Sequence, residues 1–123
     1  MDWIDEHVAV GSWVDAFVVA RLKKEEVDLI IDARTLFGRD RLSLKHFPYI
    51  DKVQRAAEML VVISKLEAKV LIRCRRGRDR TPFLAMLYVC KKYAMSYKEA
   101  YEFVRSRRPQ TVYHEEWVKM LEH

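Results

Sequence analysis

The sequence predicts a single α/β domain in which a central, mainly parallel sheet of four or five strands is flanked by helices. Two short apolar runs, residues 28–33 and 70–72, are typical of strands in the interior of such a sheet, covered on both faces. Between them, apolar residues recur at helical spacing over residues 52–66. The 123 residues are enough for one compact core but few for two, so residues 1–123 are predicted to form one domain.

Apolar spacing and turn residues predict the remaining elements. The first half of the chain is predicted to hold a strand or pair of strands over residues 3–11, a helix over 14–22, a loop over 35–44 and a short strand over 44–50. The second half is predicted to add helices over residues 81–93, 96–108 and 114–121. The middle one of these helices opens on a capping box, in which Ser96 and Glu99 satisfy each other's backbone N–H groups.

The composition limits the function classes without choosing one. A formal charge of +5 favours anionic partners such as phosphoesters, nucleic acid or acidic peptides. Two cysteines without a Cys-x-x-Cys pattern predict neither a disulfide scaffold nor a zinc site, and they suit the reducing cytoplasm. No apolar stretch approaches the roughly 20 residues needed to span a bilayer, and no signal peptide is expected.

The segment that follows the strand at residues 70–72 carries the predicted chemistry. Cys74 and Arg80 are separated by five residues and stand between this strand and a helix. Backbone N–H groups of a tight loop that enters a helix point inward together, and the helix dipole adds partial positive charge, so the loop is predicted to bind an anion. The predicted phosphate-binding residues are Arg75, Arg76, Gly77, Arg78, Asp79, Arg80 and Thr81.

Four residues of this loop have distinct predicted roles. Cys74 is the predicted nucleophile, because a helix N-terminus and nearby arginines favour the thiolate; the alternative is a buried structural cysteine. Arg80 is predicted to clamp two phosphate oxygens through its planar guanidinium. Gly77 allows the positive φ of a tight turn, and the Thr81 hydroxyl can donate to the sulfur as it departs in a second step.

The same residues resemble a known signature. Cys74, Arg80 and Thr81 match the His-Cys-x5-Arg-Ser/Thr pattern of the cysteine-based protein tyrosine phosphatase superfamily, and residues 4–12 look like the opening of small dual-specificity phosphatases. The resemblance implies a protein tyrosine phosphatase-like fold and a phosphocysteine intermediate, with an aspartic acid as proton donor and no metal or cofactor. Arg73 stands where the family usually has histidine, and it can stabilise the thiolate by charge or point away from it.

Three aspartates compete for the role of general acid. Asp51 ends a Pro-x-x-Asp sequence that resembles the end of the family's acid-bearing strand, and it is the catalytic assignment, although it suits a helix cap equally well. Asp40 lies in the basic loop and can instead pair with a neighbouring arginine. Asp79 belongs to a Gly-x-Asp-Arg-Thr sequence similar to that of phosphoinositide phosphatases, but bracing Arg80 or a neighbouring arginine is the favoured interpretation.

The predicted activity is hydrolysis of phosphate monoesters in a phosphorylated protein or another anionic phosphoester. Phosphotyrosine is the favoured substrate, with phosphoserine and phosphothreonine next. The extra arginines leave open a phosphatase of phosphoinositides, inositol phosphates or RNA 5′ ends, so nucleic acid is a less favoured partner. A non-catalytic phosphate-binding module is a third hypothesis. A rhodanese-like sulfurtransferase is disfavoured because its loop is one residue shorter.

Several other polar residues are predicted to have structural or surface roles. Cys90 is expected to pack in a buried helix without a charge partner. The others are Arg105, Arg107, Arg108, His46 and His114. Glu115 or Glu116 would position water only if this last segment folds back over the cleft.

Overall fold

A four-stranded sheet forms the centre of the structure, a computed structural model that describes residues 1–22 and 26–122. Its strands are, in spatial order, β1 (Asp2–Trp3), β2 (Val8–Gly11), β6 (Val70–Arg73) and β3 (Leu29–Asp32). β2, β6 and β3 run parallel, whereas β1 is antiparallel to its neighbour β2. The predicted α/β fold with a mainly parallel sheet is confirmed.

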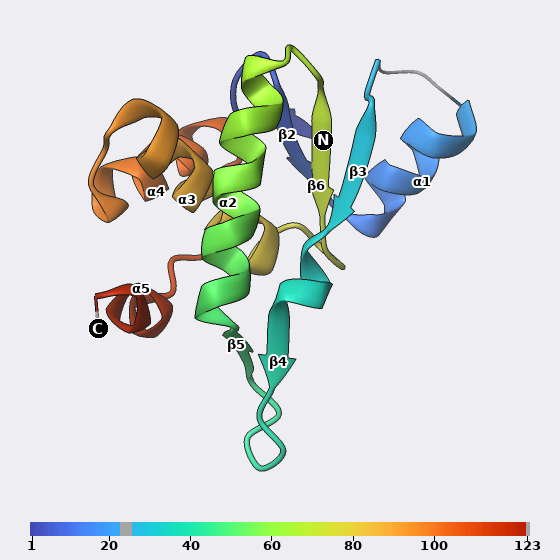
Figure 1. The fold of residues 1–123 in the computed structure, drawn as a ribbon. Helices are drawn as coiled ribbons and strands as arrows, with labels where there is room; N and C mark the ends of the chain where they lie inside the picture. The colour runs from blue at the N-terminus through green and yellow to red at the C-terminus, as the bar shows by residue number, and fades with distance from the viewer. Residues whose placement is uncertain (23–25, 123) are drawn as a thin grey trace.

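Helices cover both faces of this sheet (Figure 1). One face carries α1 (Trp13–Leu22), and the other carries α2 (Ile50–Lys65), α3 (Arg80–Tyr93) and α4 (Tyr97–Arg107). The last helix, α5 (Glu115–Leu121), lies near the lower end of α2 in Figure 1. No helix of the described residues is long and apolar enough to cross a membrane.

Side-chain alternation along β6 explains how the two layers form. Leu71 packs with Ala16 and Val19 of α1, whereas Val70 and Ile72 belong to the main core on the opposite face. All of these side chains are buried. Successive side chains of a strand point to opposite faces, so a continuous apolar run can be buried on both.

The main core is built around α3, which is buried from Thr81 to Val89. Pro82 lies in its first turn, where no intrahelical N–H bond is lost. The next helix begins at the predicted capping box. The N–H of Glu99 donates to Ser96 Oγ at 3.2 Å, and the N–H of Ser96 donates to Glu99 Oε1 at 3.3 Å. The buried helix and the capping box are both confirmed.

β3 differs from the prediction of a strand covered on both faces. It lies at the edge of the sheet beside β6, and its Leu29 and Ile30 are 43% and 36% exposed. After β3 the chain turns through a 3-10 helix, Ala33–Leu36, and its next strand leaves the sheet instead of pairing with β3. An apolar run identifies a strand, but its position in the sheet depends on which segment pairs with it.

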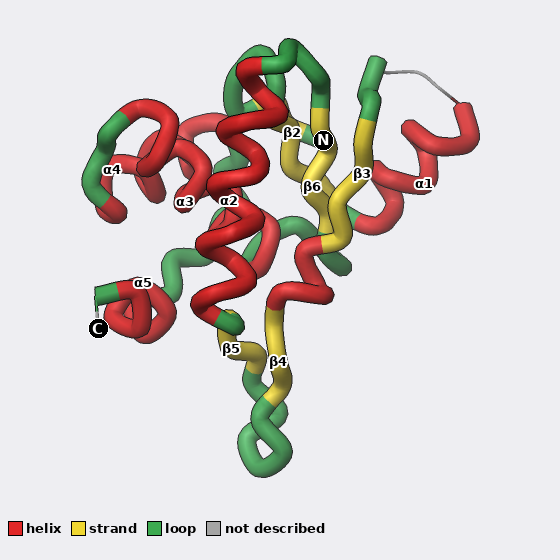
Figure 2. Tube along the Cα trace, in the orientation of Figure 1, coloured by secondary structure: helices red, strands yellow, loops and turns green. Residues whose placement is uncertain are grey.

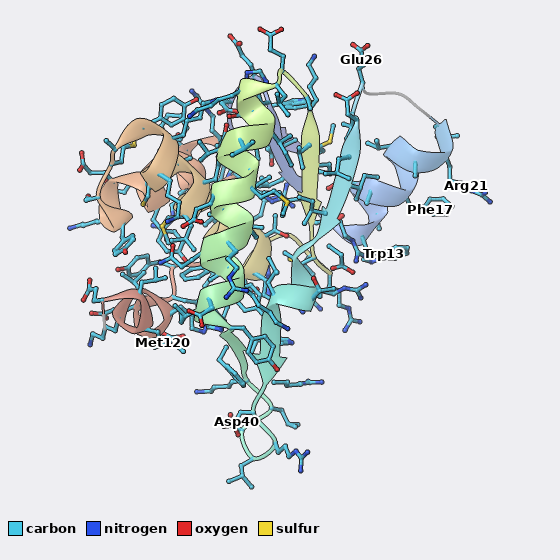
Figure 3. All side chains as sticks on the ribbon, viewed as in Figure 1. Trp13, Phe17, Arg21, Glu26, Asp40 and Met120 are labelled. Atoms are coloured by element: carbon cyan, nitrogen blue, oxygen red, sulfur yellow. The ribbon has the colours of Figure 1, made fainter. Side chains whose placement is uncertain are left out.

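The segment predicted as a basic loop is partly a β-ribbon. β4 (Phe37–Arg39) pairs antiparallel with β5 (His46–Pro48), apart from the central sheet. Asp40 lies at the tip of this ribbon (Figure 3), where its Oδ1 accepts hydrogen bonds from the N–H groups of Leu42 and Ser43 at 2.8 and 2.9 Å. The short strand predicted within residues 44–50 is confirmed, and the loop prediction holds for the tip alone.

The outer face of α1 is more apolar than a solvent-facing surface usually is. Trp13 and Phe17 are 51% and 56% exposed and point away from the sheet in Figure 3. The helix begins one residue before the predicted start, at a reciprocal cap in which the N–H of Ser12 donates to Asp15 Oδ2 at 2.8 Å and the N–H of Asp15 donates to Ser12 Oγ at 3.3 Å. The cap therefore fixes where α1 begins. The contact of α1 with the sheet is made on its other face by the small residues Ala16 and Val19.

Candidate active site

The Cys74 loop lies at the carboxyl end of β6, between this strand and α3 (Figure 2). Ligands of parallel α/β sheets bind at this end of the strands. Cys74 is only 2% exposed, so its thiol lies beneath the loop and not on its rim. Arg75, Arg76 and Arg78 are exposed around it, and Arg80 begins α3.

The surrounding protein holds the loop by its carbonyl oxygens. Those of residues 75–79 each accept a hydrogen bond, at distances of 2.6 to 3.3 Å, from a donor outside the loop. The N–H of Trp13 donates to the carbonyl of Arg75, and Nη2 and Nε of Arg108 donate to those of Arg76 and Gly77. The N–H of Val112 donates to the carbonyl of Arg78, and the N–H of Phe83 to that of Asp79. The C=O and N–H of a trans peptide point in opposite directions, so the N–H groups of residues 76–80 point into the loop.

Gly77 has the positive φ predicted for it, 68°. Its N–H donates to Cys74 Sγ at 3.2 Å, which brings a partial positive charge to the sulfur. A Cβ atom here would lie 2.5 Å from the carbonyl oxygen of Gly11 and 2.7 Å from Nη2 of Arg108. The turn therefore needs glycine for its backbone conformation and also for space.

Arg108 anchors the loop, a role that the sequence prediction missed. It was expected to be a surface cation at a helix end, but it is 3% exposed. Its Nε donates to the carbonyl of Gly77 at 2.6 Å, its Nη2 to that of Arg76 at 3.1 Å, and its Nη1 to Asp2 Oδ2 at 2.8 Å. No local signal distinguishes it from its neighbour Arg107, because its partners lie about 30 and 100 residues away in the chain.

Arg73, which replaces the family's histidine, is paired with Asp32 of the adjacent strand. The β3–β6 register sets the two residues side by side, and Arg73 Nη1 lies 2.9 Å from Asp32 Oδ2. Arg34 Nη2 binds the same oxygen at 2.8 Å. The hydrogen bond from Arg34 and the charges of both arginines hold the pKa of Asp32 below its ordinary value, although burial opposes them. The charge of Arg73 is thus partly compensated at the strand end.

Arg80 and Thr81, the last two predicted phosphate ligands, begin α3. Arg80 forms no salt bridge with any of the described residues, so no carboxylate of that part of the chain occupies its guanidinium. Thr81 is buried, and its Oγ1 has no hydrogen-bond partner within residues 1–22 and 26–122. The Thr81 hydroxyl thus makes no hydrogen bond to the sulfur of Cys74 in this structure, and its donation to the departing sulfur in a second step stays a prediction.

The three candidate acids lie in different surroundings. Asp51 is exposed in the first turn of α2, and because the cap of this helix is Tyr49, its interpretation as the cap is wrong. At the ribbon tip, hydrogen bonds from two backbone N–H groups hold the pKa of Asp40 below its ordinary value, which disfavours it as a proton donor. Asp79 is half-buried in the loop itself.

Asp79 is bound to His114, which was expected to be structural or on the surface. Asp79 Oδ1 lies 2.7 Å from His114 Nε2, whereas Asp79 Oδ2 lies 4.0 Å from Arg78 Nε. The predicted bracing of an arginine is thus secondary to the histidine. His114 Nδ1 also contacts Glu116 Oε1 at 3.0 Å, and its ring stacks on Trp117 at 3.7 Å between centroids. The last segment does fold back over the site.

A cleft of about 740 Å³ lies beside the loop, between the β4–β5 ribbon and α5. It is lined by Lys45, His46, Phe47, Asp79, His114, Glu116, Trp117 and Met120. Burial lowers the pKa of His46, and the charges of Arg80 and Arg39 lower it further, so this imidazole is neutral at neutral pH. Aromatic side chains next to a phosphate-binding loop can hold an apolar leaving group.

Other reactive groups lie away from this loop. Burial raises the pKa of Cys90 to about 11, so its thiol is protonated at neutral pH, in keeping with the packing role predicted for it. No three His, Cys, Asp or Glu side chains of the described segments gather into a group that could hold a metal ion.

The fold and the anchored cysteine loop define the class of this protein. The chain belongs to the dual specificity phosphatase family, because the model of that family's catalytic domain matches residues 10–123. The tyrosine-protein phosphatase vhp-1 of Caenorhabditis elegans is 24% identical over 119 residues, which cover 86% of this chain and 18% of vhp-1. The protein-tyrosine-phosphatase IBR5 of Arabidopsis thaliana is 30% identical over 67 residues, which cover 54% of this chain and 26% of IBR5. The chain thus spans a minor part of each relative.

Solved structures share the fold. Human DUSP28 superposes with a TM-score of 0.78 and 14% identity, over 99% of this chain and 93% of that chain. The human tyrosine phosphatase-like serine/threonine/tyrosine-interacting protein gives the same TM-score and coverage at 17% identity. At such identities the similarity establishes the architecture and leaves the chemistry to the residues of the loop.

Proposed function

We propose that residues 1–123 form one catalytic domain that hydrolyses phosphate monoesters of proteins in the cytoplasm, with Cys74 as the nucleophile. The observation that carries this proposal is the anchoring of five consecutive loop carbonyls outward, which directs N–H groups into the loop. With Arg80 at the start of α3, these donors suit the three equatorial oxygens of a transferring phosphoryl group. Family membership supports the same activity.

The proposed reaction has two steps. The Cys74 thiolate attacks phosphorus, the bond from phosphorus to the leaving oxygen breaks, and an aspartic acid gives that oxygen its proton. Water then attacks the phosphocysteine, the same carboxylate takes the proton of the water, and phosphate leaves as the thiolate re-forms. Thr81, whose hydroxyl is buried without a partner among the described residues, can donate to the departing sulfur.

Phosphotyrosine is the proposed main substrate, with phosphoserine and phosphothreonine beside it. The aromatic residues Phe47 and Trp117 in the cleft support an aromatic leaving group. The relatives named as tyrosine or dual specificity phosphatases support the same substrate class.

A second candidate function is a phosphatase of more highly charged esters. It is favoured by the exposed arginines Arg75, Arg76 and Arg78 on the loop, which raise the potential for phosphoinositides, inositol phosphates or RNA 5′ ends. A panel of phosphopeptides, inositol phosphates and 5′-triphosphate RNA distinguishes the two. A kcat/KM that is highest for phosphotyrosine peptides supports the first function, and one that is highest for a polyphosphorylated ester supports the second.

Replacing the nucleophile tests the enzyme itself. Cys74→Ser is expected to lose hydrolysis of an aryl phosphate while still binding phosphate, because the N–H groups and Arg80 remain. Cys90→Ser is the matched control and is expected to keep its activity. Absence of turnover by the unmodified chain at every pH from about 4 to 8, a range that spans the pKa values usual for catalytic carboxyl groups, would instead favour a phosphate-binding module.

Three asparagine variants identify the general acid. We propose Asp51, since its carboxyl group in the first turn of α2 is bonded to none of the described residues, and expect Asp51→Asn to lower kcat by about 10²–10⁴-fold and to remove the basic limb of the pH profile. Asp40→Asn is expected to affect the ribbon tip and to leave kcat unchanged. Loss of the basic limb in Asp79→Asn, with Asp51→Asn active, would transfer the role to the loop.

A further inference from the structure

The imidazole of His114 lies between two carboxylates beside the catalytic loop. Its Nε2 is 2.7 Å from Asp79 Oδ1, and its Nδ1 is 3.0 Å from Glu116 Oε1. The ring is stacked on Trp117 with an interplanar angle of 12°, and its side chain is 20% exposed. Both ring nitrogens are thus within hydrogen-bond distance of an oxygen while the ring is held by packing.

These two contacts need one proton more than a neutral imidazole and two carboxylates supply. A carboxylate can only accept hydrogen bonds, and a neutral imidazole has one N–H and one acceptor nitrogen. With neutral His114 and two ionised carboxylates, one nitrogen lone pair would face an oxygen lone pair at 3.0 Å or less. An imidazolium donates to Asp79 and Glu116 at once, and such charge-assisted bonds are shorter and stronger than neutral ones.

The other charged groups near this unit come from three elements. On the loop side, Arg78 Nε lies 4.0 Å from Asp79 Oδ2, and Arg80 follows directly in the chain. On the ribbon, the charge of Lys45 helps to lower the pKa of Glu116. The charge of Asp79 acts to raise the pKa of His46, against the larger effects that lower it. Behind it lies Tyr101, whose pKa burial raises so far that the phenol stays neutral. His46 and Tyr101 are therefore neutral near neutral pH, and the ring of His114 faces its two carboxylates directly.

Asp79 is the residue through which His114 reaches the site. It is the last residue before Arg80 and lies at the N-terminal cap of α3, where its carboxylate makes no cap hydrogen bond. The same C-terminal segment also binds Arg78, through the N–H of Val112 to the carbonyl oxygen of Arg78 at 2.8 Å. Without the contact to His114, the side chain of Asp79 would be free to move. Asp79 directly precedes Arg80, the proposed phosphate clamp.

We propose that His114 is a positioning residue that, as an imidazolium bridging Asp79 and Glu116, holds the end of the catalytic loop in the shape that binds phosphate. The proposal rests on the proposed function of that loop. Because coupling between two sites is reciprocal, a dianion in the loop also stabilises the proton on His114. Phosphate affinity and the protonation of His114 are therefore linked.

The proton is tested directly by NMR of the full chain with ¹⁵N-labelled histidine. At pH 7 we expect both ring nitrogens of His114 to carry protons. Glu116→Gln should lower the pH at which His114 loses a proton, because an amide can turn its N–H toward Nδ1 and satisfy a neutral ring. Glu115→Gln, one residue away and paired with Lys119, is the matched control and should change nothing. A singly protonated His114 at pH 7, with the same midpoint in both variants, would overturn the proposal.

The link to anion binding is tested with sulfate, which stays dianionic throughout, on a Cys74→Ser background that removes the thiol. Affinity should fall by roughly tenfold as His114 deprotonates with rising pH, a factor usual for coupled sites. His114→Gln, whose amide nitrogen can occupy the position of Nε2, keeps one donor to Asp79 at every pH and should abolish this dependence. A pH dependence that survives in His114→Gln would contradict the positioning role.

The two measurements separate this proposal from the proposed function. Failure of Cys74→Ser to bind sulfate at any pH would refute the phosphate-binding loop, while the NMR titration would still decide where the proton lies. Sulfate binding that does not change with pH, together with a singly protonated His114, would refute the positioning role and leave the loop intact.

Discussion

Gly77 is the residue of the loop that tolerates no side chain. Its φ is 68°, and a Cβ would lie 2.5 Å from the carbonyl oxygen of Gly11, a backbone atom that cannot rotate away. The left-handed conformation alone costs other residues about 1–2 kcal/mol. We expect Gly77→Ala to lower the free energy of unfolding by at least about 2 kcal/mol and to weaken phosphate binding. Urea unfolding and titration with inorganic phosphate measure the two effects.

Gly38 provides the matched control for Gly77. Its added methyl group would meet only the side chains of Phe47 and Tyr49, at 2.5 and 2.7 Å, and these can move. Gly38→Ala is therefore expected to cost less stability and to leave phosphate binding intact. Equal losses in the two variants would show that the backbone of Gly77 has no special role.

Arg108 acts on the loop through geometry that lysine cannot reproduce. Its guanidinium donates to two loop carbonyls and to Asp2 in three directions, whereas an ammonium group is a single point. We expect Arg108→Lys to lower the free energy of unfolding by about 2–4 kcal/mol, since hydrogen bonds of charged groups contribute about 1.5–3 kcal/mol each. Phosphate affinity should fall with it, as measured by isothermal titration.

Arg107, which directly precedes Arg108 in the chain, is its matched control. It is exposed, and its guanidinium lies 5.0 Å from the ring of Phe103. Arg107→Lys is expected to change stability by less than about 0.5 kcal/mol, as surface substitutions do. If both lysine variants bind phosphate like the unmodified chain, the loop does not depend on its tethered carbonyls.

The elements that the sequence predicts well are those with local signals. The helix over 52–66 follows from its apolar stripe, α4 from its capping box, and the Cys74 loop from a strand, a glycine and a helix in close succession. Each signal lies within a few residues of the feature that it predicts. Local chemistry therefore suffices for the strand, the loop and the helix that form the candidate site.

The elements that the sequence predicts poorly depend on distant partners. β3 has the composition of an interior strand, but the pairing of β4 with β5 leaves it at the edge. The roles of Arg108 and His114 likewise arise from contacts across more than 30 residues. No sequence pattern around either residue predicts those contacts. The interactions that hold the loop can therefore be identified only in the folded structure.

α4 offers a test of a predicted element. Ser96 Oγ accepts the N–H of Glu99 in the capping box, and removal of such a cap costs about 1 kcal/mol. We expect Ser96→Ala to lower the free energy of unfolding by about that amount, measured in urea. Ser106→Ala, in the last turn of the same helix, is the control and should cost less. Arg108 lies at the opposite end of α4, so a large loss of phosphate affinity in Ser96→Ala would contradict independent action of the cap.

At the scale of the whole molecule, Asp5 joins the N-terminal segment to the central helix. Its Oδ2 accepts hydrogen bonds from the hydroxyls of Tyr88 and Tyr93 at 2.6 and 2.8 Å, and Lys92 Nζ lies 3.3 Å away. These contacts cross more than 80 residues of sequence. The ends of β1 and β2 are thereby held against the core helix that begins at the Cys74 loop.

The carboxylate of Asp5 gives this connection a pH dependence. Burial raises its pKa, but hydrogen bonds from Tyr88, from the N–H of His7 and from Tyr93 outweigh burial and hold it below the ordinary value of 3.8. A lowered pKa in the folded state adds stability above the unfolded pKa, and this stability is lost as the pH falls through the folded pKa.

We therefore expect Asp5→Asn to lower the free energy of unfolding at pH 7 by about 2 kcal/mol, the scale of a hydrogen-bonded charge. The difference from the unmodified chain should shrink as the pH falls below 3.8, because protonation then removes the same charge from both proteins. Asp15 and Asp32 also have lowered pKa values, so both proteins lose stability in acid, and the informative quantity is the difference between them. Urea unfolding at a series of pH values measures it, with the exposed Asp51→Asn as control. A difference that stays constant from pH 7 into acid would mean that Asp5 stabilises the fold by packing and not by its charge.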